Sequence, residues 1–239
     1  MFKALADEYE IRIIFYIRRQ DDFLISAWQQ WFCKIKLDFH AWAKSDWRQA
    51  DWQGVCLHWA EIVPFQQMRV KVYEVASQEQ GGILSDFATA IGYPEPEQLL
   101  RPGRLENPSL SDAMTELMTG KKSLFKDIHD NRLFAMLSDL TSNRYLKRKG
   151  ETYVSVKDRI EIIGRYQKIN EWLCETFGLA ENAEQLFPDI RQQNLRELSV
   201  EDVNAEKEEI MLQLFLSLYA RLQEVEKRTK IANSKLNAN

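Results

Sequence analysis

The sequence has few of the residues that would place it in a specialised class of protein. It holds three cysteines among 239 residues, Cys33, Cys56 and Cys174, which are far apart and odd in number. They suggest neither a disulfide framework nor a zinc-binding spacing, and such a chain suits a reducing compartment. No apolar run approaches the ~20 residues that span a bilayer, and residues 1–10 are too polar for a secretory signal. We therefore expect a cytoplasmic protein with no membrane span.

Neither sign of charge dominates the chain. The 32 basic and 36 acidic residues leave a formal net charge of -4. This balance exerts no general attraction on nucleic acid or on an anionic membrane, so any anion site must be local and we expect no nucleic-acid partner. With 45% hydrophobic and 28% charged residues, the composition is that of an ordinary globular protein, and the length allows one large domain with an appendage.

Two strand-turn-helix units are predicted in the first hundred residues. Residues 11–17 form a short apolar run, typical of a strand buried in a parallel sheet, and Asp21 and Asp22 follow as helix caps. Residues 68–75 alternate valine with charge, and a glycine pair then leads into an amphipathic helix. A buried parallel strand needs neighbours on both sides, and only one other strand is evident. We expect the rest of the sheet to come from residues before Met1 or from a partner.

The later part of the chain is predicted to be helical. The periodicity of apolar residues indicates helices over 111–119, 122–146, 156–177 and 199–232, with Ser199 opening the last one as part of a capping box. We expect a domain over residues 1–195 and a helical extension over 196–239. The extension either packs as an arm or forms a homodimer, and its apolar stripe consists of Ile210, Leu214, Leu218, Leu222 and Val225.

One segment carries a pattern suited to a phosphate. Arg18 stands at the carboxyl end of the first predicted strand, and Ser26 lies eight residues later in the helix that follows. Ligands of open α/β sheets gather at the carboxyl ends of strands. A helix amino terminus offers free N–H groups, and arginine adds a charged fork. Phosphate binding is the stronger interpretation; the alternative is a surface arginine beside an ordinary helical serine.

The run from Tyr16 to Ser26 resembles the 3′-phosphate-binding segment of sulfotransferases that use 3′-phosphoadenosine-5′-phosphosulfate. Asp22 falls on the acidic position of that pattern, and Arg19 is a competing phosphate ligand. The resemblance covers residues 3–178. Its supporting matches, in order, are His58 to Glu61, Val70 to Glu74, Asp86 to Gly92, Tyr153 to Ser155, Arg165-Tyr166 and Asn170.

The resemblance implies an α/β protein with a partial P-loop-type sulfotransferase fold, few parallel strands and a predominantly helical C-terminal part. It implies transfer of a sulfuryl group from 3′-phosphoadenosine-5′-phosphosulfate to a hydroxyl of a carbohydrate or similar acceptor, without a metal. The family's phosphate loop lies upstream of the arginine, and we expect that it does not fit within the seventeen residues before Arg18. The proline of the family's turn is also missing. The resemblance assigns the catalytic base to no residue of this chain.

A weaker match is Arg148-Lys149-Gly150, which is similar to an element that touches the same 3′-phosphate in some sulfotransferases. A solvated helix end is the simpler interpretation of this tripeptide. Among the tryptophans, Trp28 and Trp31 have the spacing of core residues. Trp47 and Trp52 lie in a polar stretch, and we expect them to be contacts for an acceptor sugar.

Two rival functions stay open at this point. One is a non-catalytic interaction protein, a truncated sulfotransferase relative whose helices bind a partner. The other is a different nucleotide-handling enzyme such as a kinase, which is disfavoured because no Walker-type loop and no magnesium-binding acidic strand end is visible.

Overall fold

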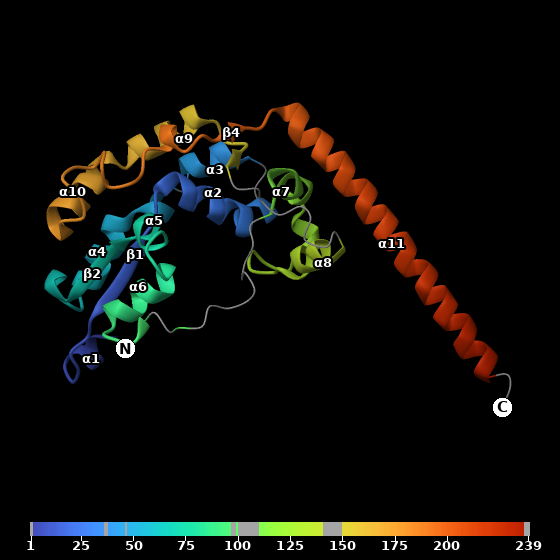
Figure 1. Cartoon of the computed structure of the whole chain (residues 1–239), viewed down its shortest axis with the longest axis horizontal. Coiled ribbons are helices and arrows are strands. Elements are labelled where there is room, and N and C mark those ends of the chain that lie inside the picture. Colours follow the sequence, from blue (N-terminus) through green and yellow to red (C-terminus); the bar gives the residue numbers. More distant parts are fainter. Residues whose placement is uncertain are drawn as a thin grey trace. The chain divides into compact units, whose positions relative to one another are not determined.

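The protein is mixed α/β and mostly helical, with few parallel strands (Figure 1). The computed structural model describes residues 2–35, 38–45, 47–96, 99, 110–140 and 150–236. For residues 47, 138 and 231–236 it describes the backbone alone. Its elements are α1 Phe2–Ala6, β1 Ile13–Ile17, α2 Gln20–Gln30, α3 Phe39–Ser45, α4 Trp52–Ala60, β2 Met68–Val72, α5 Tyr73–Ala76, α6 Gly82–Ala90, α7 Asp112–Met118, α8 Arg132–Leu140, β3 Glu151–Thr152, α9 Val156–Arg165, α10 Gln167–Phe177, β4 Arg196–Glu197 and α11 Val200–Leu236.

The two predicted strands pair with each other. β1 and β2 run parallel with Ile13 opposite Met68 and Ile17 opposite Val72. A second parallel pair, β3 with β4, was not predicted, because two residues per strand are too few for a hydrophobic alternation to show. The coarse fold prediction of few parallel strands followed by helices is therefore confirmed.

Strand β1 is less buried than its apolar sequence predicts. Within it only Ile17 is fully buried, and the four residues before it are half-buried. On β2 the prediction extended too far: the strand ends at Val72 and the chain turns into α5, which leaves Val75 exposed.

Helix α6 is held to both strands by side chains, because its Asp86 accepts hydrogen bonds from Tyr16 of β1 and Lys71 of β2.

Several helix ends follow from local sequence. At the start of α11, the Asp202 N–H donates to Ser199 Oγ at 3.0 Å and the Ser199 N–H donates to Asp202 Oδ2 at 3.0 Å, so the predicted reciprocal cap is confirmed. At the end of α10, Gly178 adopts φ 64° and its N–H donates to the Cys174 carbonyl at 2.8 Å. That left-handed conformation favours glycine, as the sequence predicts.

The single helix predicted over 156–177 is wrong in its continuity and its buried face. It divides at Tyr166 into α9 and α10, and Ile160, an apolar residue of the predicted helix, is 42% exposed. The buried face runs through Arg159, Ile162, Tyr166, Asn170 and Leu173. Two of its members, Arg159 and Asn170, are polar. Periodicity of hydrophobic residues alone could not find such a face.

The chain divides into two compact units. The first contains residues 1–27, 40–106 and 154–195, and the second contains residues 28–39, 107–153 and 196–239. The C-terminal helix therefore belongs with α7 and α8 rather than standing alone. An apolar core holds the second unit together, formed by Leu110, Ala113, Met114, Met118, Phe125, Leu137, Val203 and Ile210. Among the described residues, no helix is long and apolar enough to cross a membrane.

Candidate anion site at the carboxyl end of β1 and β2

Charged residues follow both strands of the parallel pair directly. Arg18 and Arg19 come immediately after β1, and Tyr73 and Glu74 come immediately after β2. Because β1 and β2 are parallel and in register, their carboxyl ends lie at the same edge of the sheet. This is the edge at which open α/β folds bind ligands, and all four residues belong to the first unit.

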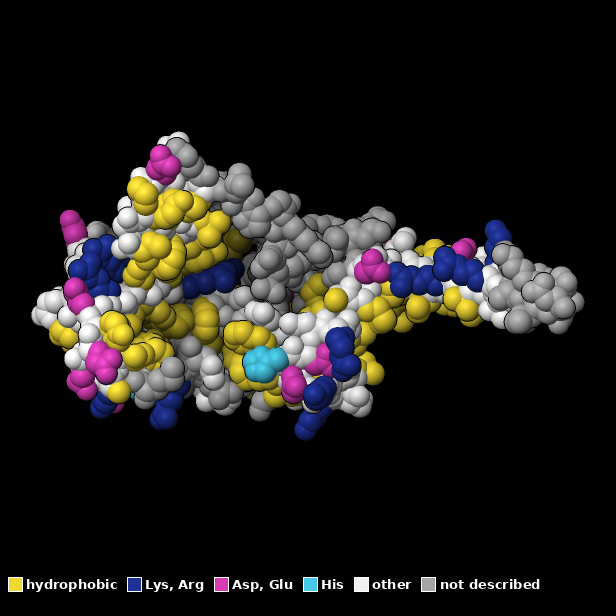
Figure 2. Space-filling view, turned by 90° about the horizontal axis from the view of Figure 1, so that it is seen from below, with side chains coloured by type: hydrophobic (Ala, Val, Ile, Leu, Met, Phe, Trp, Pro, Cys, Tyr) yellow, Lys and Arg dark blue, Asp and Glu magenta, His cyan; other side chains and the backbone are white. Residues whose placement is uncertain are grey.

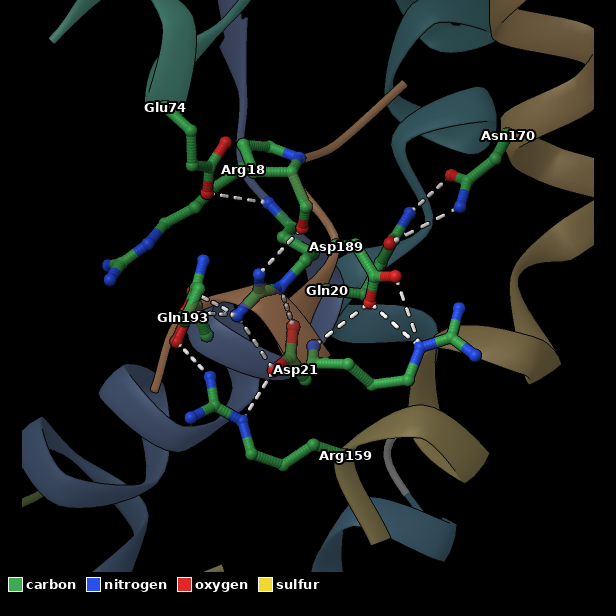
Figure 3. A network of polar contacts seen from close by, with 12 residues as sticks. Arg18, Gln20, Asp21, Glu74, Arg159, Asn170, Asp189 and Gln193 are labelled. Atoms are coloured by element: carbon green, nitrogen blue, oxygen red, sulfur yellow. Dashed lines mark hydrogen bonds and ion pairs between the residues drawn. The ribbon is translucent and has the colours of Figure 1, made fainter. Parts of the chain in front are cut away.

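Arg19 donates to several partners in a buried polar network, which includes Asp21 and Gln193 (Figure 3). Its side chain is 1% exposed. Its Nε donates to Asp21 Oδ1 at 2.6 Å, one Nη donates to Asp22 Oδ2 at 2.8 Å, and the other Nη donates to the Pro188 carbonyl at 3.0 Å. Burial alone would lower the pKa of Arg19, but the hydrogen bonds and charges of the two aspartates outweigh it and raise the pKa.

A second arginine completes this network. Arg159 of α9 is 3% exposed, donates from Nε to Asp21 Oδ2 at 2.6 Å, and also donates to Asp22. Two guanidinium groups thus share two carboxylates, and the four formal charges cancel. Such a cluster is costly to desolvate, and it is stable only when its hydrogen bonds are satisfied from both sides.

Arg18 has a different environment from its neighbour. Its carbonyl accepts a hydrogen bond from Trp52 Nε1 at 2.8 Å, and its guanidinium carbon lies 5.7 Å from the centre of the Tyr73 ring. Figure 3 shows the side chain directed away from the network around Arg19. No acidic side chain in the described part of the chain forms an ion pair with it. Stacking on a ring leaves the N–H edge of a guanidinium available to an anion.

Glu74 stands beside the two arginines. Its Oε1 accepts the backbone N–H of Arg19 at 3.0 Å, and its Oε2 is buried without a hydrogen-bond partner among the described residues. Burial raises the pKa of this carboxyl, although the Arg19 N–H and the positive charge of Arg18 act in the opposite direction. Burial therefore makes the charged form of this carboxyl less favourable than that of an exposed glutamate.

The remaining predicted ligands are less closely assembled. Ser26 is half-buried in the second turn of α2, on the same helical face as Asp22 four residues earlier. Gly150 belongs to the second unit, where its carbonyl accepts the Arg196 N–H at 2.8 Å. Arg148 and Lys149 lie outside the described residues. The structure therefore brings Arg18 and Arg19 to one strand end, and of these two residues Arg18 has its guanidinium outside the ion pairs formed among the described residues.

A cleft of about 730 Å³ lies beside the buried network, within the first unit. Helices α9 and α10 form one wall and residues 183–192 form the other. Its lining is mixed, and the side chains of Arg19, Ile163, Gln167, Asn170, Phe187 and Arg191 contribute to it. Asn170 is itself hydrogen-bonded to Gln20, with Gln20 Nε2 donating to Asn170 Oδ1 at 2.5 Å. In the described parts of the chain, no group of three His, Cys, Asp or Glu residues is arranged to hold a metal ion.

The structure corrects one expectation and adds two residues. Trp52, expected to contact an acceptor, is 5% exposed and packs edge-on against Phe15 and Phe23. The side chain of Trp47 lies outside the described residues. Sequence reasoning missed Arg159 and the carboxyl of Glu74. Hydrophobic periodicity gave no signal for Arg159, because a charged side chain on the buried face of α9 interrupts that pattern.

Comparison with curated proteins finds a relative in Archaeoglobus fulgidus, described as an uncharacterized protein, which is 26% identical over 170 residues. The alignment covers 70% of this chain and 46% of the relative, so the chain spans about half the length of the protein that it matches. No family model matches the chain. No solved structure matches it significantly.

Proposed function

We propose that the first unit binds the 3′-phosphate of a phosphorylated nucleotide through Arg18, as part of a sulfuryl-transfer site that uses 3′-phosphoadenosine-5′-phosphosulfate. The observation that carries this proposal is the environment of Arg18. The residue directly follows a parallel strand, its backbone is held by Trp52, and its guanidinium stacks on Tyr73 instead of pairing with a carboxylate. The resemblance of residues 16–26 to sulfotransferases supports the same position.

The 3′-phosphate role concerns binding rather than bond making. In sulfuryl transfer, the acceptor oxygen forms a bond to sulfur while the bond between sulfur and the phosphate oxygen of the donor breaks. The hydroxyl proton passes to a base. Arg18 would hold the distant end of the donor and so orient its reacting end, with the Ser26 hydroxyl as a neutral partner. We propose a carbohydrate hydroxyl as the acceptor, and no residue of this chain is assigned to the 5′-phosphosulfate.

Arg19 does not fit the role of a second phosphate ligand. Its guanidinium is buried and its donors are directed at Asp21, Asp22 and the Pro188 carbonyl. A phosphate would have to replace a carboxylate that also holds Arg159. The two aspartates at the start of α2 are already neutralised by Arg19 and Arg159, so this cluster lies outside the proposed phosphate site.

Calorimetric titration of the full chain with adenosine 3′,5′-bisphosphate tests the proposal. Loss of one charge-assisted interaction removes about 1.5–3 kcal/mol, so Arg18→Ala should weaken binding roughly 10-fold to 100-fold. Adenosine 5′-monophosphate, which lacks the 3′-phosphate, should bind more weakly by a similar factor.

Arg12→Ala provides a matched control, because Arg12 is an exposed arginine just before the same strand, paired with Glu10 at 2.7 Å. This variant should bind like the unmodified chain. Binding that does not depend on Arg18, or that does not distinguish the two nucleotides, would contradict the proposed site. Absence of any binding would favour the non-catalytic function.

A further inference from the structure

The long helix α11 has one face that is already covered within its own unit. Val203 and Ile210 of this helix are 1% and 0% exposed in the apolar core with α7 and α8. On the same side, Lys207 pairs with Glu116 at 2.8 Å and Ser217 Oγ donates to the Leu140 carbonyl at 2.9 Å. These contacts fix which side of α11 faces its neighbours. Ile210, expected on a dimer stripe from the sequence, belongs to this covered side.

A second apolar stripe on α11 faces solvent. Figure 2 shows hydrophobic side chains in a row along this helix with basic side chains beside them. The five members are each more than half exposed: Met211 59%, Phe215 65%, Leu218 53%, Leu222 56% and Val225 58%. They recur at alternating spacings of four and three residues. That repeat averages 3.5 residues, the period of a left-handed coiled coil.

The charges beside the stripe indicate what covers it. Phe215 and Leu222 take the first core position of the heptad, and Leu218 and Val225 take the second. Arg221 then directly precedes the core residue Leu222, and Glu226 directly follows the core residue Val225. In a parallel pair of identical helices, these two positions face each other across the interface five residues apart. Arg221 of each copy therefore meets Glu226 of the other. In an antiparallel pair, the position before a core residue faces the same kind of position on the partner, so Arg221 would not meet Glu226.

We infer that α11 pairs with α11 of a second copy of this chain as a parallel, in-register, two-stranded coiled coil. The stripe from Met211 to Val225 forms its core. Leu212 and Tyr219, which are 56% and 53% exposed, lie beside the core and widen the apolar contact. Arg221 is also bonded to Asp139 of its own chain, but that pair is solvent-exposed on both sides, so the guanidinium is accessible to a partner.

Sedimentation equilibrium of the full chain over a wide range of concentration tests this inference. The unmodified protein should associate to a dimer. Leu218→Asp places a carboxylate in the core of both helices, so it should weaken dimerisation at least about 100-fold. Circular dichroism of the variant should be unchanged, because Leu218 is exposed within the single chain.

Leu216→Asp is the matched control for this experiment. Leu216 is a leucine on the same helix with a similar exposure, 48%, but its position in the heptad lies outside the core. This variant should dimerise like the unmodified chain. The inference is overturned if the unmodified chain is a monomer at every concentration. It is also overturned if the two variants weaken the dimer equally, which would indicate a different occupant of the apolar surface. The same holds if neither variant weakens the dimer.

Orientation is tested separately with Val225→Cys. In a parallel in-register pair, the two introduced thiols face each other across the core and should form a disulfide-linked dimer under mild oxidation. The native cysteines Cys33, Cys56 and Cys174 are buried and should not contribute. If the variant dimerises but forms no disulfide-linked dimer on oxidation, the two helices are not parallel and in register, and the parallel arrangement is overturned. As a second readout, Arg221→Glu should weaken the dimer, and adding Glu226→Arg should restore it.

Discussion

Each unit encloses a cluster of buried side chains, and the two clusters differ in chemistry. In the first, Arg19 and Arg159 share Asp21 and Asp22 in a nearly dry cluster of ion pairs. The second is built around an apolar cluster into which α11 inserts Ile210. An apolar core tolerates the loss of a methyl group at modest cost, whereas an ionic core depends on every partner. A single substitution in the ionic cluster of the first unit is therefore expected to cost more than one in the apolar cluster of the second.

The largest effect is expected from removing the carboxylate that both arginines share. Asp21→Ala leaves two buried guanidinium groups with one half-exposed aspartate between them. The free energy of unfolding should fall by about 3–5 kcal/mol, measured by urea denaturation. Asp139→Ala is the control, because that carboxylate pairs with Arg221 at a surface where such pairs contribute about 0–1 kcal/mol. Similar losses for the two variants would show that the buried cluster is not structural.

A smaller effect is expected in the apolar core of the second unit. Ile210→Val removes one methylene group from a fully buried side chain and should lower the free energy of unfolding by about 0.5–1.5 kcal/mol. Leu216→Ala, an exposed position of the same helix, should change it little. A loss at position 210 as large as that of Asp21→Ala would remove the contrast between the two cores.

The smallest effect concerns pH at the strand ends. The pKa of Glu74 is raised in the folded protein, chiefly by burial, so its contribution favours folding at low pH and is lost as the pH rises through the folded pKa. Glu74→Gln keeps an oxygen for the Arg19 N–H but cannot ionise. Relative to the unmodified chain, this variant should gain stability between about pH 4.5 and neutrality, measured by denaturation at several pH values. A gain that is equal at pH 4 and pH 7 would contradict the raised pKa.

Much of the secondary structure could be predicted from short stretches of sequence. The apolar run ending at Ile17, the serine cap of α11 and the glycine that ends α10 each depend on neighbours within a few residues. The buried face of α9 could not be predicted. Arg159 enters it only because Asp21, far away in the chain, supplies the opposite charge.

In the candidate site too, part of the arrangement could be predicted from the sequence and part could not. The sequence indicated that arginines follow the first strand, but it gave Arg18 and Arg19 the same chemistry. Their different roles arise partly from tertiary contacts, since Tyr73 lies under the Arg18 guanidinium, whereas Arg19 donates to the Pro188 carbonyl. Asp21 and Asp22, which pair with Arg19, lie only two and three residues after it, but the sequence alone does not show that they pair with Arg19 and not with Arg18.

The sequence by itself determined the strands β1 and β2, the helical C-terminal part and the caps of α10 and α11, because periodicity and capping are properties of short segments. Only the tertiary structure decided which arginine is free, which apolar stripe of α11 faces solvent and where Arg159 lies. Each of these depends on contacts between segments far apart in the chain. Burial and partner choice set the energy of a charge or an apolar side chain, and they are fixed only when those segments meet.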